Sequence, residues 1–252
     1  MNKTADTDTT NAIRIWAVVP AAGLSRRMGS PKQILPFGES TVTGTVVRTL
    51  LAADPAGLIV VTRSELADRL ELPDDPRVRC IINDDGASEM IDSIRCALDA
   101  LAGWHGLALA RPCERGGAGM TGAGPEPNAA GRADGSLART GVFEEPQRSD
   151  GICVVPGDVP NLSAETVRAC FRAYRSRPRR IVIAAHAGKR GHPIVFPFAL
   201  KCEVDVLTGG LNELIQRHEQ AAYLVDTDDA GALADINTPA EYDRESAAHR
   251  FP

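Results

Sequence analysis

The stretch Ile13-Arg14-Ile15-Trp16-Ala17-Val18-Val19-Pro20 runs directly into Ala21-Ala22-Gly23-Leu24-Ser25-Arg26-Arg27-Met28-Gly29-Ser30-Pro31-Lys32. The first segment is an apolar run with the length of a buried strand. The second is a loop in which Gly23 and Gly29 let the backbone approach a ligand and adopt dihedral angles that other residues avoid. Backbone N–H groups in such a loop can converge on an anion. The two segments therefore predict a strand whose carboxyl end opens into a phosphate-binding loop.

The charges of this loop favour an anionic ligand as well. Arg27 offers a rigid guanidinium fork, and Lys32 offers a mobile point charge. The residue order differs from that of an ordinary P-loop and from the glycine fingerprint of dinucleotide folds. Because a surface turn with solvated cations has the same composition, the loop alone leaves both interpretations open.

Strand and helix patterns alternate along the rest of the chain. Further strands are predicted at 57–62, 78–83, 151–156 and 180–185, and helices at 41–53, at 88–101 and from Ser163 onward. This alternation indicates an α/β fold with a mostly parallel sheet and helices on both faces. In such sheets ligands bind beyond the carboxyl ends of the strands, which is where the loop at 21–32 lies.

Composition narrows the class of protein. The 252 residues carry a net charge of -5, which disfavours nucleic-acid binding because that depends on basic patches. No segment has the pattern of a signal peptide or the length of a membrane span, so we expect a cytoplasmic protein without a membrane partner. None of the six cysteines forms a CxxC pair, and we expect them to be reduced.

One segment interrupts the alternation of strands and helices. Residues 103–150 hold ten of the 23 glycines and show little apolar periodicity, which predicts a disordered insert. The polar residues 1–11 predict a disordered N-terminal tail. We therefore expect one domain over residues 12–252, with the insert inside it.

Two carboxylates stand out after predicted strands or before a predicted helix. Asp158 follows the strand at 151–155, and Ser163 is the better cap for the next helix, so Asp158 has no evident structural role. Carboxylates hold Mg²⁺ in ones and twos alongside substrate phosphates. Near the C-terminus, a capping box gives Thr238 and Glu241 a structural role. It gives none to Asp235, which we take as a second metal ligand.

His192 lies between Gly191 and Pro193, after the predicted strand at 180–185. The residue before a proline is held out of the helical region, and we expect His192 in an exposed turn. A lone histidine is more often structural than catalytic. Its position at a strand end and the nearby cations favour a role in ligand binding.

Together these segments resemble the MobA-like NTP transferase family, on its molybdenum cofactor cytidylyltransferase branch. The matching residues are Ala22-Gly23-x-Ser25-x-Arg27-Met28-Gly29-x-x-Lys32, Leu35-Pro36-Phe37-Gly38, Asn83-x-x-Gly86 with Ser93, Gly157-Asp158-x-Pro160, Gly191-His192-Pro193 and Asp235-Ile236-x-Thr238-Pro239. The resemblance covers nearly all of the chain except the tail and the insert. It implies a Rossmann-like fold of the nucleotide-diphospho-sugar transferase type.

The resemblance also implies a reaction. A phosphate of molybdopterin or molybdenum cofactor would attack the α-phosphorus of CTP in a Mg²⁺-dependent step, and pyrophosphate would leave. Ala21-Ala22-Gly23 and the Gly-His-Pro segment favour CTP over GTP. The implied catalytic residues are Arg27, Lys32 and Asp158, the nucleotide-binding residues are Ala22, Gly23, Ser25, Arg27, Lys32, Asn83 and Ser93, the acceptor-binding residue is His192, and the metal ligands are Asp158 and Asp235.

Two other functions stay open. The same chemistry would serve a sugar phosphate or another small phosphorylated acceptor. A module that binds the cofactor and delivers it to a recipient molybdoenzyme would not need the metal carboxylate of Asp158. The chain also departs from the family pattern at Glu89 and Asp92, where relatives carry small polar residues. These carboxylates would either weaken nucleotide binding or face solvent.

Overall fold

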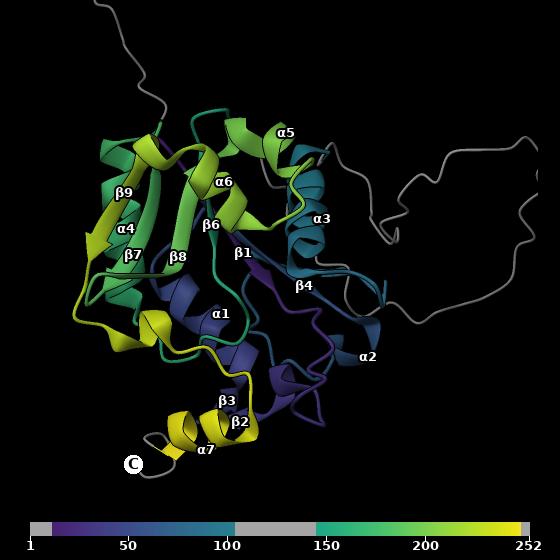
Figure 1. Ribbon diagram of the computed structural model, residues 1–252. Helices are drawn as coiled ribbons and strands as arrows, with labels where there is room; N and C mark the ends of the chain where they lie inside the picture. The colour runs from purple at the N-terminus through teal and green to yellow at the C-terminus, as the bar shows by residue number, and fades with distance from the viewer. Residues whose placement is uncertain (1–11, 104–144, 248–252) are drawn as a thin grey trace, which may run out of the picture.

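The computed structural model describes residues 12–103 and 145–247 and is built on a seven-stranded sheet in the order β5-β4-β1-β6-β8-β7-β9 (Figure 1). The strands are β1 (Ile15–Pro20), β2 (Pro36–Phe37), β3 (Ser40–Thr41), β4 (Gly57–Thr62), β5 (Val78–Ile82), β6 (Gly151–Val154), β7 (Ile181–His186), β8 (Lys189–Pro197) and β9 (Ala222–Asp226). The α-helices are α1 (Val42–Ala52), α2 (Ser64–Ala67), α3 (Met90–Ala102), α4 (Ala164–Ser176), α5 (Lys201–Val204), α6 (Leu211–Arg217) and α7 (Pro239–Ala247). Short 3₁₀ helices lie at 32–34, 198–200, 219–221 and 230–233.

The sheet is mostly parallel, as the sequence predicts. β1 pairs in parallel with β4 and β6, β4 with β5, and β7 with β9. β8 alone runs the other way, antiparallel to both β6 and β7. The predicted strands at 57–62, 78–83, 151–156 and 180–185 are confirmed as β4 to β7, and the predicted helices as α1, α3 and α4.

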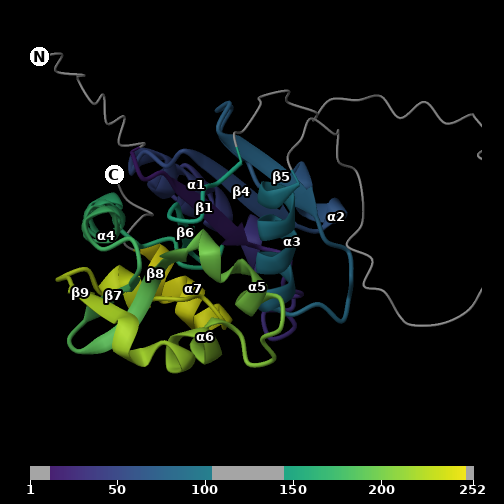
Figure 2. The ribbon, with the colours of Figure 1, turned by 90° about the horizontal axis from the view of Figure 1, so that it is seen from above.

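Helices cover both faces of the sheet, which explains why β1 is an almost unbroken apolar run. Ile15, Ala17 and Val19 belong to the core under α1 and α4, whereas Trp16 and Val18 belong to the core under α3, α5 and α6. Figure 2 shows the two groups of helices on opposite sides of the sheet. The parallel strands β1, β4, β5 and β6 therefore end at one common edge, where the predicted loop begins.

Asp150 fixes the start of β6. Its carboxylate accepts hydrogen bonds from Arg14 N at 3.0 Å, Arg14 Nε at 3.1 Å and Gln147 N at 2.9 Å. Of the predicted insert, residues 104–144 lie outside the described residues, and 145–150 are described. Asp150 thus ties the described end of the insert to β6, the strand that precedes Asp158.

Tyr174 of α4 holds the same region from the other side. Its ring is buried, and its hydroxyl lies 3.1 Å from Ser149 O, 3.2 Å from Asp150 O and 3.0 Å from Pro178 O. Removing the hydroxyl leaves buried carbonyls without this partner. We expect Tyr174→Phe to lower the free energy of unfolding by about 1–2 kcal/mol in a denaturant titration. The matched control is Tyr223→Phe on the exposed strand β9, and a control that loses as much stability contradicts this role.

A small apolar cluster joins the region of β2 and α1 to the segment before α7, at the edge of the sheet where the parallel strands end. Phe37, Val42 and Ile236 are buried together, and Tyr242 of α7 donates to Pro36 O at 2.6 Å. Figure 1 shows α7 beside β2 and β3. The cluster brings the segment 235–238 next to the loop at 21–32.

The start of α7 follows the predicted capping box. Glu241 Oε2 accepts hydrogen bonds from Asn237 N at 2.8 Å and Thr238 N at 2.9 Å, and Thr238 Oγ1 accepts one from Glu241 N at 3.3 Å. The same contacts hold Asn237 in position beside the loop at 21–32.

In the described ranges, the helices are too short or too polar to cross a membrane.

Candidate active site

A cavity of about 180 Å³ opens where β1 and β6 end. Its walls come from the loop after β1, the first turn of α3, the loop after β6 and the segment before α7. The lining residues are Pro20, Ala21, Ala22, Gly23, Lys32, Gln33, Ser88, Glu89, Met90, Ser93, Pro156, Gly157, Asp158 and Asn237. Five predicted site residues therefore meet in one cavity, namely Ala22, Gly23, Lys32, Ser93 and Asp158.

Lys32 connects three of these walls. Its Nζ donates to Asp158 Oδ2 at 2.5 Å, to Ile236 O at 2.7 Å and to Asn237 Oδ1 at 3.0 Å. An ammonium group has three donors, and these contacts use all of them. A phosphate that binds Lys32 must compete with these acceptors.

Asp158 has one carboxylate oxygen to spare. Oδ2 faces Lys32, whereas Oδ1 is buried and has no hydrogen-bond partner among the described residues. A buried carboxylate oxygen without a partner is costly, and a hard divalent cation would satisfy it. In the described parts of the chain, no three His, Cys, Asp or Glu side chains are grouped to hold a metal by themselves. The chemistry fits Mg²⁺, which takes one or two carboxylates and completes its shell with water and substrate phosphates.

The loop after β1 is braced from inside by Gln33. This side chain is only 2% exposed, donates to Gly23 O at 2.6 Å and accepts from Ser25 Oγ at 3.1 Å. Ser25 Oγ also accepts from Lys32 N at 3.1 Å. Ser25 therefore shapes the loop and is absent from the cavity lining. Arg27 is exposed and also lies outside that lining.

Asn83 supports the α3 wall from behind. It is 3% exposed, and its Nδ2 lies 2.8 Å from Ser88 Oγ and 3.5 Å from Ser93 Oγ. Both hydroxyls line the cavity, whereas Asn83 does not. Asn83 thus orients two hydroxyl groups of the cavity wall.

The structure contradicts the expected exposed turn at His192. This residue lies within strand β8 and is half-buried, and its Nδ1 is buried without a hydrogen-bond partner in the part of the chain that the structure describes. The reason is that the turn falls earlier, at Ala187 and Gly188, and β8 then runs back along β7. His192 and Asp235 both lie outside the cavity lining.

Burial lowers the pKa of His192, although the nearby carboxylates of Asp158 and Asp235 act in the opposite direction. When the pKa of a histidine is lowered by folding, the free energy of unfolding is highest at pH values above the pKa of the unfolded chain, about 6.5. The contribution of the histidine is lost as the pH falls below that value, because the unfolded chain then binds the proton more readily. We expect the free energy of unfolding to fall between pH 7 and pH 5, and His192→Asn to reduce this slope in denaturant titrations. His218→Asn is the control, and an equal reduction there contradicts the assignment.

A family model for the MobA-like NTP transferase domain matches residues 17–222. The chain belongs to the MobA-like NTP transferase family. It is 30% identical over 217 residues, 81% of the chain and 77% of the relative, to 2-C-methyl-D-erythritol 4-phosphate cytidylyltransferase of Escherichia coli O1:K1. A shorter match, 36% identical over 107 residues, covers 39% of the chain and 44% of the enzyme of the same name from Salmonella newport. A nucleotidyl transferase from Methanothermobacter shares the fold, with a TM-score of 0.62 and 20% identity over 94% of the chain and 97% of that structure.

As a MobA-like NTP transferase, the protein is a nucleotidyltransferase, and its cavity has the groups that this chemistry needs. Lys32 brings a positive charge to the cavity, Asp158 brings a carboxylate, and Gly23 adds a residue without a side chain. Transfer at a phosphorus atom asks the protein mainly for position and charge neutralisation.

The sequence alone missed several lining residues of this MobA-like NTP transferase. Gln33 and Ser88 carry no distinguishing pattern, and Met90 lies in the helix predicted at 88–101 with no sign of a role in binding. Asn237 stood inside the quoted Asp-Ile-x-Thr-Pro motif as its unspecified position, so the motif itself was the available signal. Glu89 was noted only as a departure from the family.

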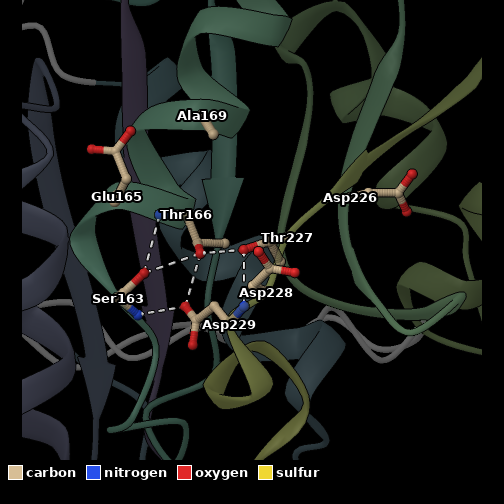
Figure 3. Close-up of a pocket in the computed structure, with 8 residues that line it drawn as sticks. All are labelled: Ser163, Glu165, Thr166, Ala169, Asp226, Thr227, Asp228 and Asp229. Atoms are coloured by element: carbon tan, nitrogen blue, oxygen red, sulfur yellow. Dashed lines mark hydrogen bonds between the residues drawn. The ribbon is translucent and has the colours of Figure 1, made fainter.

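A second hollow, of about 490 Å³, lies at the start of α4 (Figure 3). It is lined by Ser163, Glu165, Thr166, Ala169, Asp226, Thr227, Asp228 and Asp229. Asp229 accepts from Ser163 N and Thr166 Oγ1, both at 2.8 Å, and from Gly231 N at 2.9 Å. The polar groups of the hollow thus bind one another, and the negative charge of its aspartates repels a nucleotide. We assign this hollow to the anchoring of α4.

Proposed function

We propose that this protein transfers CMP from CTP to the phosphate of a molybdopterin-type acceptor, with Mg²⁺ as its cofactor and release of pyrophosphate. The observation that carries the proposal is the pair of Lys32 Nζ and Asp158 Oδ2, 2.5 Å apart in the cavity, with Asp158 Oδ1 buried and without a partner within residues 12–103 and 145–247. A cation that would bind phosphate, Lys32, thus lies next to a carboxylate that would bind a metal ion, Asp158. When bound, Mg²⁺ would neutralise charge on the triphosphate.

The residues of this chain divide the work of binding. Lys32, with Arg27 from the exposed part of the loop, would neutralise the triphosphate, and Gly23 would pass the backbone close to it. Asp158 would hold Mg²⁺, and Asp235 would approach as its second carboxylate. Ser93, oriented by Asn83, would contact the base. Cytosine is favoured because the relatives at 30% identity are cytidylyltransferases.

The acceptor would enter beside His192. Its pKa is lowered by burial, so a neutral imidazole would face the acceptor at neutral pH. Such a ring can offer a hydrogen bond without adding charge next to Asp158 and Asp235. The Gly191-His192-Pro193 segment supports a molybdopterin-type acceptor. We place the reaction in the cytoplasm, with a molybdoenzyme as recipient of the product.

A second candidate keeps the chemistry and changes the acceptor. The relatives are named for 2-C-methyl-D-erythritol 4-phosphate, and one of them aligns with 81% of the chain. This observation favours a phosphorylated sugar alcohol. A delivery module without turnover is less favoured, because binding alone does not need the free oxygen of Asp158.

The test measures pyrophosphate release with each of the four NTPs and Mg²⁺. Each reaction is run without acceptor, with molybdenum-loaded molybdopterin and with 2-C-methyl-D-erythritol 4-phosphate. We expect release with CTP and the molybdopterin acceptor only. Release with the erythritol phosphate instead selects the second candidate, and nucleotide binding without any release selects the delivery module.

A further inference from the structure

The first turn of α3 brings one carboxylate to the cavity and keeps another away from it. Asp92 accepts hydrogen bonds from Glu89 N at 2.9 Å and from Arg95 Nη1 at 2.8 Å. Arg95 also donates to the carbonyl oxygens of Val204 and Leu207, so it faces the packed side of the helix. Asp92 therefore belongs to the helix start and its packing. Glu89, the N-cap residue of α3, is exposed and lines the cavity. Its side chain accepts from the backbone N–H of Asp92 in a capping box, and a carboxylate with two oxygens keeps further acceptor capacity for a ligand.

Ser93 presents a hydrogen-bond donor on the same wall. Its Oγ faces the amide of Asn83, which leaves the hydroxyl hydrogen for an acceptor in the cavity. The hydroxyl of Ser88, by contrast, donates to Glu89 O at 3.3 Å. Glu89 and Ser93 are four residues apart and share one face of the helix start. The wall thus offers a donor and an acceptor one helical turn apart.

We propose that Glu89 selects a nucleobase with an exocyclic amine and makes the site reject uracil, an inference that rests on the nucleotidyltransferase function proposed above. Cytosine presents a carbonyl oxygen for Ser93 and an amine for Glu89. Uracil presents a second carbonyl oxygen where cytosine has the amine. An ionised carboxylate only accepts hydrogen bonds, so Glu89 and this oxygen would face each other unpaired.

Met90 would contact the base but would not distinguish one base from another. The side chain is 51% exposed and lines the cavity next to Glu89. A thioether makes favourable contacts with aromatic rings of any identity. Met90 would cover the ring of each base equally, and the difference between bases comes from Glu89, which pairs with one and opposes the other.

The test compares the dissociation constants of Mg-CTP and Mg-UTP by calorimetry, with no acceptor present. We expect the wild-type protein to bind CTP at least about tenfold more tightly than UTP. Glu89→Gln can donate as well as accept, and should bring the two constants to within about threefold. Glu89→Ser also removes the carboxylate and keeps an N-cap residue, so it should give the same loss of preference.

Glu65→Gln is the matched control, because Glu65 is an exposed carboxylate in the first turn of α2 and lies outside the cavity lining. It should keep the preference of the wild-type protein. Equal binding of CTP and UTP by the wild-type protein overturns the inference, and so does a preference that survives in both Glu89 variants. Failure of every NTP to bind overturns the proposed function itself.

Discussion

Asp158→Asn should lower turnover by about 10³-fold while the protein remains folded. The amide removes the charge that would hold Mg²⁺, and charge stabilisation by a metal is worth several kcal/mol at the transition state. In the wild-type protein Lys32 Nζ lies 2.5 Å from Asp158 Oδ2, and the amide oxygen of the variant can still accept this hydrogen bond. We therefore expect a melting temperature close to that of the wild-type protein. Pyrophosphate release over a range of Mg²⁺ concentrations measures the effect.

Asp228→Asn is the control for this variant. Asp228 is an exposed aspartate at the second hollow, outside the nucleotide cavity. Its removal changes the net charge equally and should leave turnover unchanged. Wild-type turnover in Asp158→Asn would move the metal role to Asp235, and an equal loss in Asp228→Asn would show that general charge, and not metal binding, is responsible.

The sheet was predictable because its signals are local. β1, β4, β6 and β7 are short apolar runs, and burial on both faces demands that pattern. The reversed strand β8 was missed because it begins with charged and half-buried residues, from Lys189 to His192. Its pairing with β6 and β7 is a long-range property that residue order does not display.

The site was predictable to the extent that each residue follows a strand or opens a helix. Parallel strands end at one edge, so Lys32 and Asp158 could be expected near each other. The direct contact between them could not, because it depends on how Ile236 and Asn237 are held against the loop. The apolar cluster of Phe37, Val42 and Ile236 fixes that approach, and its members are spread over 200 residues.

Two carboxylates show the same limit. Glu89 and Asp92 are three residues apart, and sequence could not decide whether they face the nucleotide or solvent. In the structure Asp92 pairs with Arg95, and Glu89 belongs to the cavity lining. In the capping box of α3 each of the two side chains also accepts from the backbone N–H of the other residue. The direction of a side chain at a helix start depends on its partner, and here that partner is Arg95, which α5 holds in turn.

Lys32→Met should reduce kcat/KM for the nucleotide by about 10²-fold, because a charge-assisted contact to phosphate is worth about 1.5–3 kcal/mol. Methionine keeps the length of the chain and removes its charge. Lys32→Arg should not restore full activity, since a planar guanidinium does not fit the position of a compact ammonium group between Asp158 and Asn237. Initial rates over a range of CTP concentrations give this result. Lys201→Met is the control, because Lys201 pairs with Asp99 at 2.6 Å and with Asp205 at 2.9 Å and lies outside the cavity lining.

The same variant should also destabilise the protein without ligand. Lys32 joins the loop after β1 to Asp158 and to the segment at 236–237, and its loss leaves the Asp158 carboxylate without its cation. Both side chains are partly exposed, so we expect a loss of about 2 kcal/mol, less than for a fully buried pair. Thermal melts should fall by about 4–8 °C. Because a triphosphate would replace these acceptors at Lys32, Mg-CTP should raise the melting temperature of the wild-type protein more than that of Lys32→Met. Equal stabilisation of both proteins would contradict the role of Lys32 in binding phosphate.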